Sequence, residues 1–149
     1  MSSGAARRRS REAALQVLYA ADLARTLRPE QPGGAEESFE RVVRHFDLPE
    51  GARAFAKELV SGVAERLTEL DARIASQAQN WRIERMAVVD RNVLRIAALE
   101  LLSSDTPVEI VLDEAVELAR RFGGDASPAF VNGILDAVAR DARKTPGRR

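Results

Sequence analysis

The sequence predicts an all-α protein, a single compact bundle of about six or seven helices. Two observations support this fold class. Apolar residues recur at three- and four-residue spacing along most of the chain, which is the period of one helix face. No segment alternates apolar and polar residues over the length of a β-strand. The 149 residues, of which 45% are hydrophobic and 31% charged, are enough to bury one hydrophobic core.

The N-terminal part contains two predicted helices separated by a predicted loop. The first helix covers residues 9–27, and its apolar stripe consists of Ala14, Val17, Leu18 and Ala21. Residues 28–37 hold two prolines and two glycines, so we expect a loop there. A short helix over residues 38–45 is expected to end at the Leu48-Pro49 step.

The rest of the chain shows the clearest helical periodicity. Apolar residues at helical spacing run from residue 55 to residue 74, as one helix or as two helices with a break. Residues 79–81 are expected to connect this segment to a helix over residues 86–102. The remaining signals are a turn at 104–107, a helix over 108–122, a stop at Gly123-Gly124 and a last helix that begins at Ser127-Pro128.

Two glycines lie inside predicted helices, where glycine costs roughly 1 kcal/mol relative to alanine. They are Gly62 and Gly133. We expect a close helix crossing, with no room for a Cβ atom, to compensate at both positions. Gly133→Ala should then lower the melting temperature.

The residue inventory excludes most catalytic and metal chemistry. The chain has no cysteine and one histidine, His45, so thiolate sites, multi-histidine metal sites and His-dependent triads are not expected. Neither glycine pair is followed by a phosphate-binding lysine. Three acids cluster on the polar face of one predicted helix, where acids near an N-terminus usually serve the helix dipole: Asp113, Glu114 and Glu117. We therefore expect no enzymatic activity, no metal and no cofactor.

The location is inferred by elimination. No apolar run long enough for a signal peptide follows the basic N-terminal segment, and no stretch approaches the roughly 20 apolar residues of a membrane span. We expect a cytoplasmic protein with no membrane association.

The net charge of zero hides an uneven distribution. Residues 1–11 and residues 140–149 each carry a net charge of +4, so the remaining residues carry −8. Basic ends favour contact with a polyanion, and an acidic body favours a basic partner. Solvated basic tails explain the charge pattern about equally well.

The N-terminal arginines are the strongest candidate binding residues. Arg7, Arg8, Arg9 and Arg11 lead into a helix that also carries Gln16 and Tyr19. Arginine binds phosphates and stacks on bases, while glutamine and tyrosine add hydrogen bonds and a stacking surface. This mixture favours single-stranded RNA over duplex DNA.

Two positions in the second half are also candidates. Phe130 falls at the edge of the apolar stripe of the last helix, where it is either a core residue or a stacking surface. Asp90 precedes an apolar stripe, where its carboxylate is either a solvated group that favours the helix dipole or a partner contact.

Four stretches carry a family resemblance. They are AARRRSREAALQVLYA (5–20), VDRNVLRIAALEL (89–101), PVEIVLDEAVELARRFG (107–123) and SPAFVNGILD (127–136). On these stretches, which are in register and span most of the chain, the sequence resembles the NusB family of bacterial transcription antitermination factors.

The resemblance implies a fold and a function. The fold would be all-helical, with two packed helical subdomains. The protein would bind single-stranded boxA RNA together with a small ribosomal protein, the tenth of the small subunit. The pair would join an antitermination complex on RNA polymerase during ribosomal RNA synthesis. Residues 1–141 would form the RNA-binding domain, with a variable segment at about residues 26–50 and a basic tail at residues 142–149.

The resemblance also assigns roles to residues. RNA would be contacted by Arg7, Arg8, Arg9, Arg11, Gln16 and Phe130, and the ribosomal protein by Tyr19 and Asp90. Ala126 occupies a position that is commonly acidic in the family, so the contact made by that loop is in question. Some family members are homodimers, and the sequence leaves the oligomeric state open, as it does the exact RNA preference and the affinity without the ribosomal partner.

Two other functions remain open at this point. Similar helical domains are fused to ribosomal RNA methyltransferases, so the chain is alternatively a separate accessory of such an enzyme. It is otherwise a helical interaction protein whose basic ends are inert tails.

Overall fold

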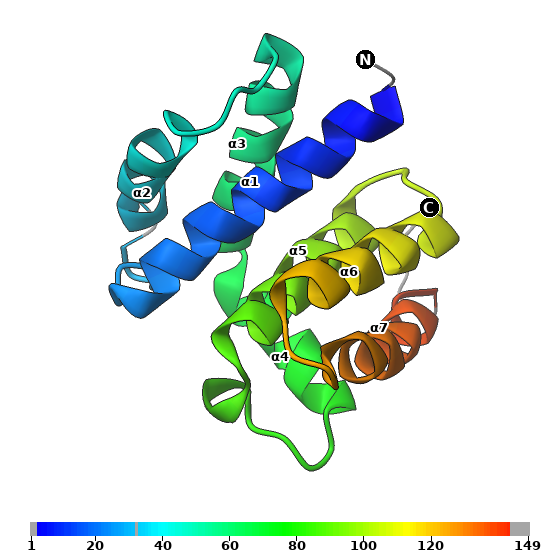
Figure 1. The fold of residues 1–149 in the computed structure, drawn as a ribbon. Helices are drawn as coiled ribbons and strands as arrows, with labels where there is room; N and C mark the ends of the chain where they lie inside the picture. Colours follow the sequence, from blue (N-terminus) through cyan, green and yellow to red (C-terminus); the bar gives the residue numbers. More distant parts are fainter. Residues whose placement is uncertain (1–2, 32, 144–149) are drawn as a thin grey trace. The chain divides into compact units, whose positions relative to one another are not determined.

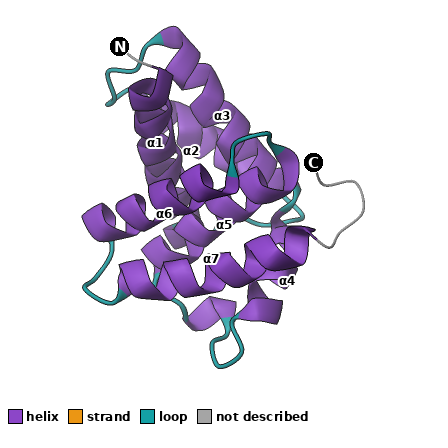
Figure 2. Ribbon diagram, turned by 90° about the vertical axis from the view of Figure 1, so that its right-hand side faces the viewer, coloured by secondary structure: helices purple, strands orange, loops and turns teal. Residues whose placement is uncertain are grey.

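A computed structural model describes residues 3–31 and 33–143, and over these residues the chain forms seven α-helices and one 3₁₀ turn (Figure 1). Within this part of the chain the only β-type pairing is an isolated bridge between Arg28 and Gln31, and Figure 2 shows helices joined by loops. The all-α prediction is therefore confirmed. The chain divides into two compact units, residues 1–67 and residues 68–149, which are described separately below.

Unit 1 consists of three helices that all contact one another: α1 (Ser3–Leu23), α2 (Gly33–Val43) and α3 (Glu50–Glu65). Its core includes Leu15, Leu18, Phe39, Val43 and Val60, each at most 2% exposed. One buried polar contact joins two of the helices, because the Ser10 hydroxyl donates to the carbonyl of Ala52 at 2.8 Å. The N-terminal residues of α1 are thus fixed against α3.

The boundaries of α1 differ from the predicted ones at both ends. The helix begins at Ser3, so Arg7 and Arg8 lie within it rather than ahead of it. It ends at Leu23 because Arg25 adopts a left-handed conformation with φ 62°, and the amide of Thr26 donates to the carbonyl of Ala21 at 2.9 Å. This pattern of a left-handed residue followed by a backward hydrogen bond is typical of helix C-termini.

The loop predicted over residues 28–37 is wrong for its second half, because α2 begins at Gly33. Ala35 and Phe39 are each 1% exposed, and a helix that started at residue 38 would lack the first of these core positions. Burial of the apolar face therefore outweighs the local cost of the glycines.

Unit 2 contains most of α4 (Leu67–Gln77), the 3₁₀ turn η1 (Ile83–Arg85) and three long helices. The long helices are α5 (Val88–Ser103), α6 (Val108–Phe122) and α7 (Ser127–Arg143), and each contacts the other two. Of the two alternatives for residues 55–74, the structure has two helices with a break, since Arg66 separates α3 from α4. The predicted basic tail falls largely outside the described residues, because α7 continues to Arg143 and residues 144–149 are not described.

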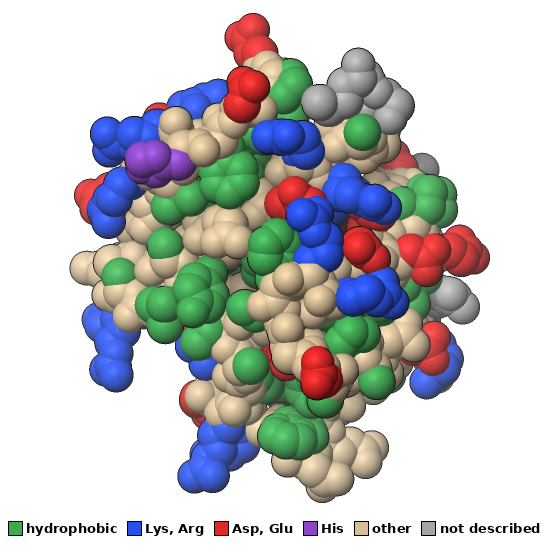
Figure 3. All heavy atoms as spheres, viewed as in Figure 1, with side chains coloured by type: hydrophobic (Ala, Val, Ile, Leu, Met, Phe, Trp, Pro, Cys, Tyr) green, Lys and Arg blue, Asp and Glu red, His purple; other side chains and the backbone are tan. Residues whose placement is uncertain are grey.

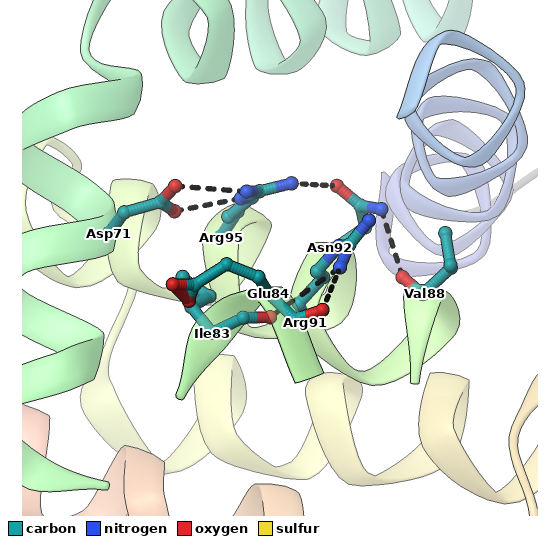
Figure 4. Close-up of polar contacts among 7 residues, drawn as sticks. All are labelled: Asp71, Ile83, Glu84, Val88, Arg91, Asn92 and Arg95. Carbon is teal, nitrogen blue, oxygen red and sulfur yellow. Dashed lines mark hydrogen bonds and ion pairs between the residues drawn. The ribbon is translucent and has the colours of Figure 1, made fainter. Parts of the chain in front are cut away.

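A polar network ties α4 to α5 (Figure 4). Arg95 donates to both carboxylate oxygens of Asp71, at 2.8 and 2.9 Å, and to the amide oxygen of Asn92 at 3.0 Å. Asn92, which is fully buried, donates in turn to the carbonyl of Val88 at 2.9 Å. Because each of these groups has a hydrogen-bonding partner, the network fixes how α4 lies on α5. A separate ion pair, Arg73 with Asp141 at 3.3 Å, joins α4 to α7.

Two glycines of unit 2 play different roles. A Cβ atom on Gly123 would come within 2.5 Å of the Ser127 hydroxyl and 2.8 Å of the Ala119 carbonyl oxygen, so this turn has no room for a side chain. A Cβ atom on Gly133 would meet nothing within 4 Å. The expected close helix crossing is therefore wrong at Gly133, which is exposed on α7.

Candidate nucleic-acid interface

Two of the four N-terminal arginines are held by the same aromatic ring. The guanidinium of Arg7 lies over the ring of Phe55 on α3, 4.3 Å from its centroid, and that of Arg11 lies 5.6 Å from the same centroid. Positions 7 and 11 are one turn apart on a helix, so both side chains reach one neighbour. Both separations fall within the range of cation–π attraction. The Phe55 ring thus holds two positive charges in place.

The four arginines differ in their accessibility. Arg7 and Arg8 are exposed, and Arg9 is half-buried with Nη2 donating to the carbonyl of Asp47 at 3.0 Å. Arg11 is only 3% exposed. A guanidinium as buried as that of Arg11 supports its neighbours more readily than it reaches a phosphate. Residue type and spacing do not distinguish it from the other three.

The Nε atom of Arg9 is buried and has no hydrogen-bond partner in the described structure. The hydrogen bond of this side chain to the Asp47 carbonyl is made through Nη2. A buried polar atom without a partner is costly, so an acceptor that reached this atom would be bound favourably.

One stripe of α1 combines the remaining candidates of unit 1. At about 100° per residue, Arg8, Gln16 and Tyr19 fall within roughly 80° of the helix circumference. Leu23 falls on the same stripe; it is 57% exposed, and Tyr19 is 36% exposed. The structure thus brings two predicted RNA contacts and one predicted partner contact onto one face of α1. The sequence did not predict the exposed apolar residue, Leu23, at its end.

Asp90 lies in the first turn of α5 and is only 8% exposed. Its Oδ1 atom is buried and has no hydrogen-bond partner within the part of the chain that the structure describes. A carboxylate in this position favours the helix dipole. The predicted partner residue is therefore a poorly accessible group with one unsatisfied oxygen, rather than an exposed acid.

Phe130 is half-buried on α7 and packs against Trp81, which lies in the connector between α4 and η1. The ring centroids are 5.5 Å apart and the planes meet at 79°, an edge-to-face arrangement. Trp81 is 55% exposed, although large aromatic side chains are usually much more buried. The sequence predicts only a connector at residues 79–81. The signal for a role of Trp81 is its exposure, which the sequence does not show.

Figure 3 shows Lys and Arg side chains as well as Asp and Glu side chains at the surface. The single histidine, His45, is exposed. Among the described residues, no group of three or more His, Cys, Asp or Glu side chains is arranged to hold a metal ion. No helix in the described ranges is long and apolar enough to cross a membrane.

The sequence was compared with protein-family models and with curated proteins, and both comparisons identify the same family. The family model described as the NusB family matches residues 8–140. The transcription antitermination protein NusB of Sorangium cellulosum is 49% identical over 140 residues, which cover 90% of this chain and 91% of that protein.

Solved structures give the same result. NusB of T. maritima superposes with a TM-score of 0.80 and 36% identity, covering 91% of each chain. A chain in a crystal structure of the antitermination factors NusB and NusE in complex with double-stranded RNA superposes with a TM-score of 0.78 and 29% identity. That match covers 91% of this chain and 97% of the other.

Proposed function

Since the chain belongs to the NusB family of transcription antitermination proteins, which are not enzymes, we propose that it binds single-stranded boxA RNA together with a small-subunit ribosomal protein, the tenth. The pair acts within an antitermination complex on RNA polymerase during ribosomal RNA synthesis, in the cytoplasm. In this proposal the RNA-binding domain comprises residues 1–141, with a variable segment at residues 26–50 and a basic tail at residues 142–149.

One observation carries the proposal. The exposed guanidinium of Arg7 is held 4.3 Å over the Phe55 ring, on a helix that begins at Ser3. A solvated tail without a binding role would not be expected to form such a contact. Arg7 and Arg8 contact RNA phosphates directly, Arg9 adds a partly anchored charge, and Arg11 supports them from its buried position. Gln16 and Phe130 complete the RNA contacts.

The test is a salt titration with fluorescently labelled boxA RNA. In the variant Arg7→Ala/Arg8→Ala we expect weaker binding, and the slope of log affinity against log salt should fall by roughly 0.7 for each single-strand phosphate that is no longer neutralised. The matched control is Arg41→Ala/Arg44→Ala, which removes two exposed basic residues, one within α2 and one just after it. Unchanged affinity and slope in the first variant would refute the proposal.

The second part of the proposal concerns the ribosomal protein and the stripe of α1 that carries Arg8, Gln16, Tyr19 and Leu23. A basic ribosomal protein complements the acidic body of the chain, and Tyr19 with Leu23 offers it an exposed apolar contact. Asp90, with its unsatisfied oxygen, contributes once a donor from the partner reaches it. In a gel shift, RNA and ribosomal protein together should bind more tightly than either alone, and Tyr19→Ala should remove this gain.

A homodimer that covers the Tyr19 surface is the alternative occupant of the stripe. Sedimentation of the protein alone distinguishes the two cases. A dimer that the ribosomal protein dissociates identifies the surface as shared, whereas a dimer that persists in the ternary complex places self-association elsewhere.

A further inference from the structure

We infer that Trp81 and Phe130 together form a stacking site for an unpaired RNA base in unit 2, with Trp81 as its exposed face. The inference rests on the proposed function and extends it, because Trp81 supplies a base contact in addition to Phe130. Four features support it: the geometry of the two rings, the polar groups around them, the hydrogen bonds that fix the connector, and the character of the rim.

The ring geometry leaves a stacking surface available. An edge-to-face contact at 5.5 Å and 79° uses the edge of one ring and one face of the other. Trp81 remains 55% exposed after this contact is made. Phe130 therefore holds the indole in place without covering it.

The surroundings of Trp81 match the groups of a nucleotide. Gln79, Asn80 and Arg82 are exposed and line, together with Trp81, a shallow depression of about 590 Å³. Amide side chains can both donate and accept hydrogen bonds at base edges, and a guanidinium binds phosphate. Two acids also border the depression: Asp71, whose carboxylate is occupied by Arg95, and Glu84.

The connector that carries Trp81 is fixed from both sides. The amide of Trp81 donates to the carbonyl of Ala78 at 2.9 Å. On the other side Nη1 of Arg91, from α5, donates to the carbonyls of Ile83 at 3.5 Å and Glu84 at 3.3 Å, so it holds η1 (Figure 4). A stacking surface whose orientation is already set loses little entropy when a ligand binds.

A base fits this surface better than an apolar protein segment does. A hydrophobic side chain from a partner requires an apolar rim that excludes water. The exposed residues that line this depression beside Trp81 are mixed: two amides, an arginine and Glu84, together with the small side chains of Ala72 and Ala75. A base presents a flat π-face for the indole and a polar edge for the amides, which is the usual recognition of unpaired RNA.

The test uses the fact that Trp81 is the only tryptophan of the chain, so tryptophan fluorescence reports on this position alone. Titration of the full chain with single-stranded boxA RNA should quench the emission, with a midpoint equal to the one measured by anisotropy of labelled RNA. Trp81→Ala should weaken RNA binding by roughly 5- to 150-fold, the range expected for removal of one base stack. Trp81→Phe should retain most of the affinity.

The matched control is Ile110→Ala, which removes another exposed large apolar side chain of unit 2, 48% exposed on α6. It should leave RNA affinity unchanged. Circular dichroism of each variant checks folding, and the quenching of the unmodified chain decides the question even where Trp81→Ala fails to fold.

Three results would overturn the inference, and they are distinguishable. RNA that binds by anisotropy while Trp81 emission and the affinity of Trp81→Ala stay unchanged leaves the proposed function intact and removes only the stacking site. If Trp81→Ala loses ribosomal-protein binding but keeps its RNA affinity, the surface around Trp81 docks a protein instead of a base. Absence of RNA binding by the unmodified chain, with or without the ribosomal protein, refutes the proposed function and this inference together.

Discussion

The arginine end of α1 and the connector that carries Trp81 position their binding groups in different ways. At the arginine end, surface contacts hold the charges: the Phe55 ring under Arg7 and the Asp47 carbonyl beside Arg9. The connector lies beside a buried network in which Arg95 binds Asp71 with two hydrogen bonds. A charge acts over several ångströms and tolerates motion, whereas a stacked ring must keep its orientation. The connector, whose ring needs a fixed orientation, therefore follows a helix that is hydrogen-bonded to α5 through side chains.

The largest expected effect follows from removing the hydrogen bonds between α4 and α5. Arg95→Ala removes both hydrogen bonds to the Asp71 carboxylate and one hydrogen bond to the amide oxygen of Asn92, and we expect the free energy of unfolding to fall by about 3 kcal/mol. The side chains of Arg95 and Asp71 are 8% and 23% exposed, so solvent replaces the guanidinium only in part. Urea denaturation followed by circular dichroism measures the change.

The control for Arg95 is an exposed ion pair in unit 1. Arg53 and Glu40 are 2.7 Å apart, but their side chains are 43% and 62% exposed. Arg53→Ala should therefore lower the free energy of unfolding by less than about 1 kcal/mol. Equal destabilisation of the two variants would show that the network around Arg95 contributes no more to stability than a surface ion pair.

The second expected effect concerns the salt dependence of RNA binding. Removing two phosphate contacts with Arg7→Ala/Arg8→Ala should lower the salt slope by about 1.4, because each single-strand contact contributes roughly 0.7. Trp81→Ala should weaken binding and leave the slope unchanged, since stacking releases no counterions. Affinity measured over a series of salt concentrations separates the two. A reduced slope in Trp81→Ala would mean that the indole orients Arg82 rather than a base.

A smaller effect is expected from the ring beneath the arginines. Phe55→Leu keeps every charge and removes the cation–π contacts, each worth roughly 0.5–1 kcal/mol, so RNA affinity should fall severalfold with little change in salt slope. A double-mutant cycle with Arg7→Ala should give a coupling energy of about the same size. A coupling energy of zero would mean that Phe55 only packs in unit 1 and does not position the Arg7 guanidinium.

The helices of this chain follow from its hydrophobic periodicity, but their ends do not. The stripe through Val17 and Leu18 predicts α1, and both residues are fully buried. The start of α2 escapes prediction because a local pattern of proline and glycine favours a loop, while the burial of Ala35 depends on tertiary contacts. Local composition cannot show which apolar residue will find a neighbour.

In the candidate site, too, the local sequence predicts the residue types but not their tertiary contacts. Residue type and spacing are sufficient to predict the arginine segment. They do not show that Arg11 is 3% exposed while Arg7 lies at the surface. Nor do they show that Trp81 packs against Phe130 and is still 55% exposed. These properties depend on residues far away in sequence, and they appear only when the fold brings α1 to α3 and the connector to α7.

The smallest expected effect tests whether helix stability and ring orientation are independent in unit 2. Gly133 lies one turn from Phe130 on α7 and has open space beside it, so Gly133→Ala should raise the free energy of unfolding by up to about 1 kcal/mol. Gly123→Ala, the opposite control, should lower it because its Cβ would collide with the Ala119 carbonyl. RNA affinity should stay within about twofold for Gly133→Ala, since neither ring is touched. A larger change would mean that the outward face of α7 around Gly133 itself contacts the RNA, and the stacking site would then extend along the helix.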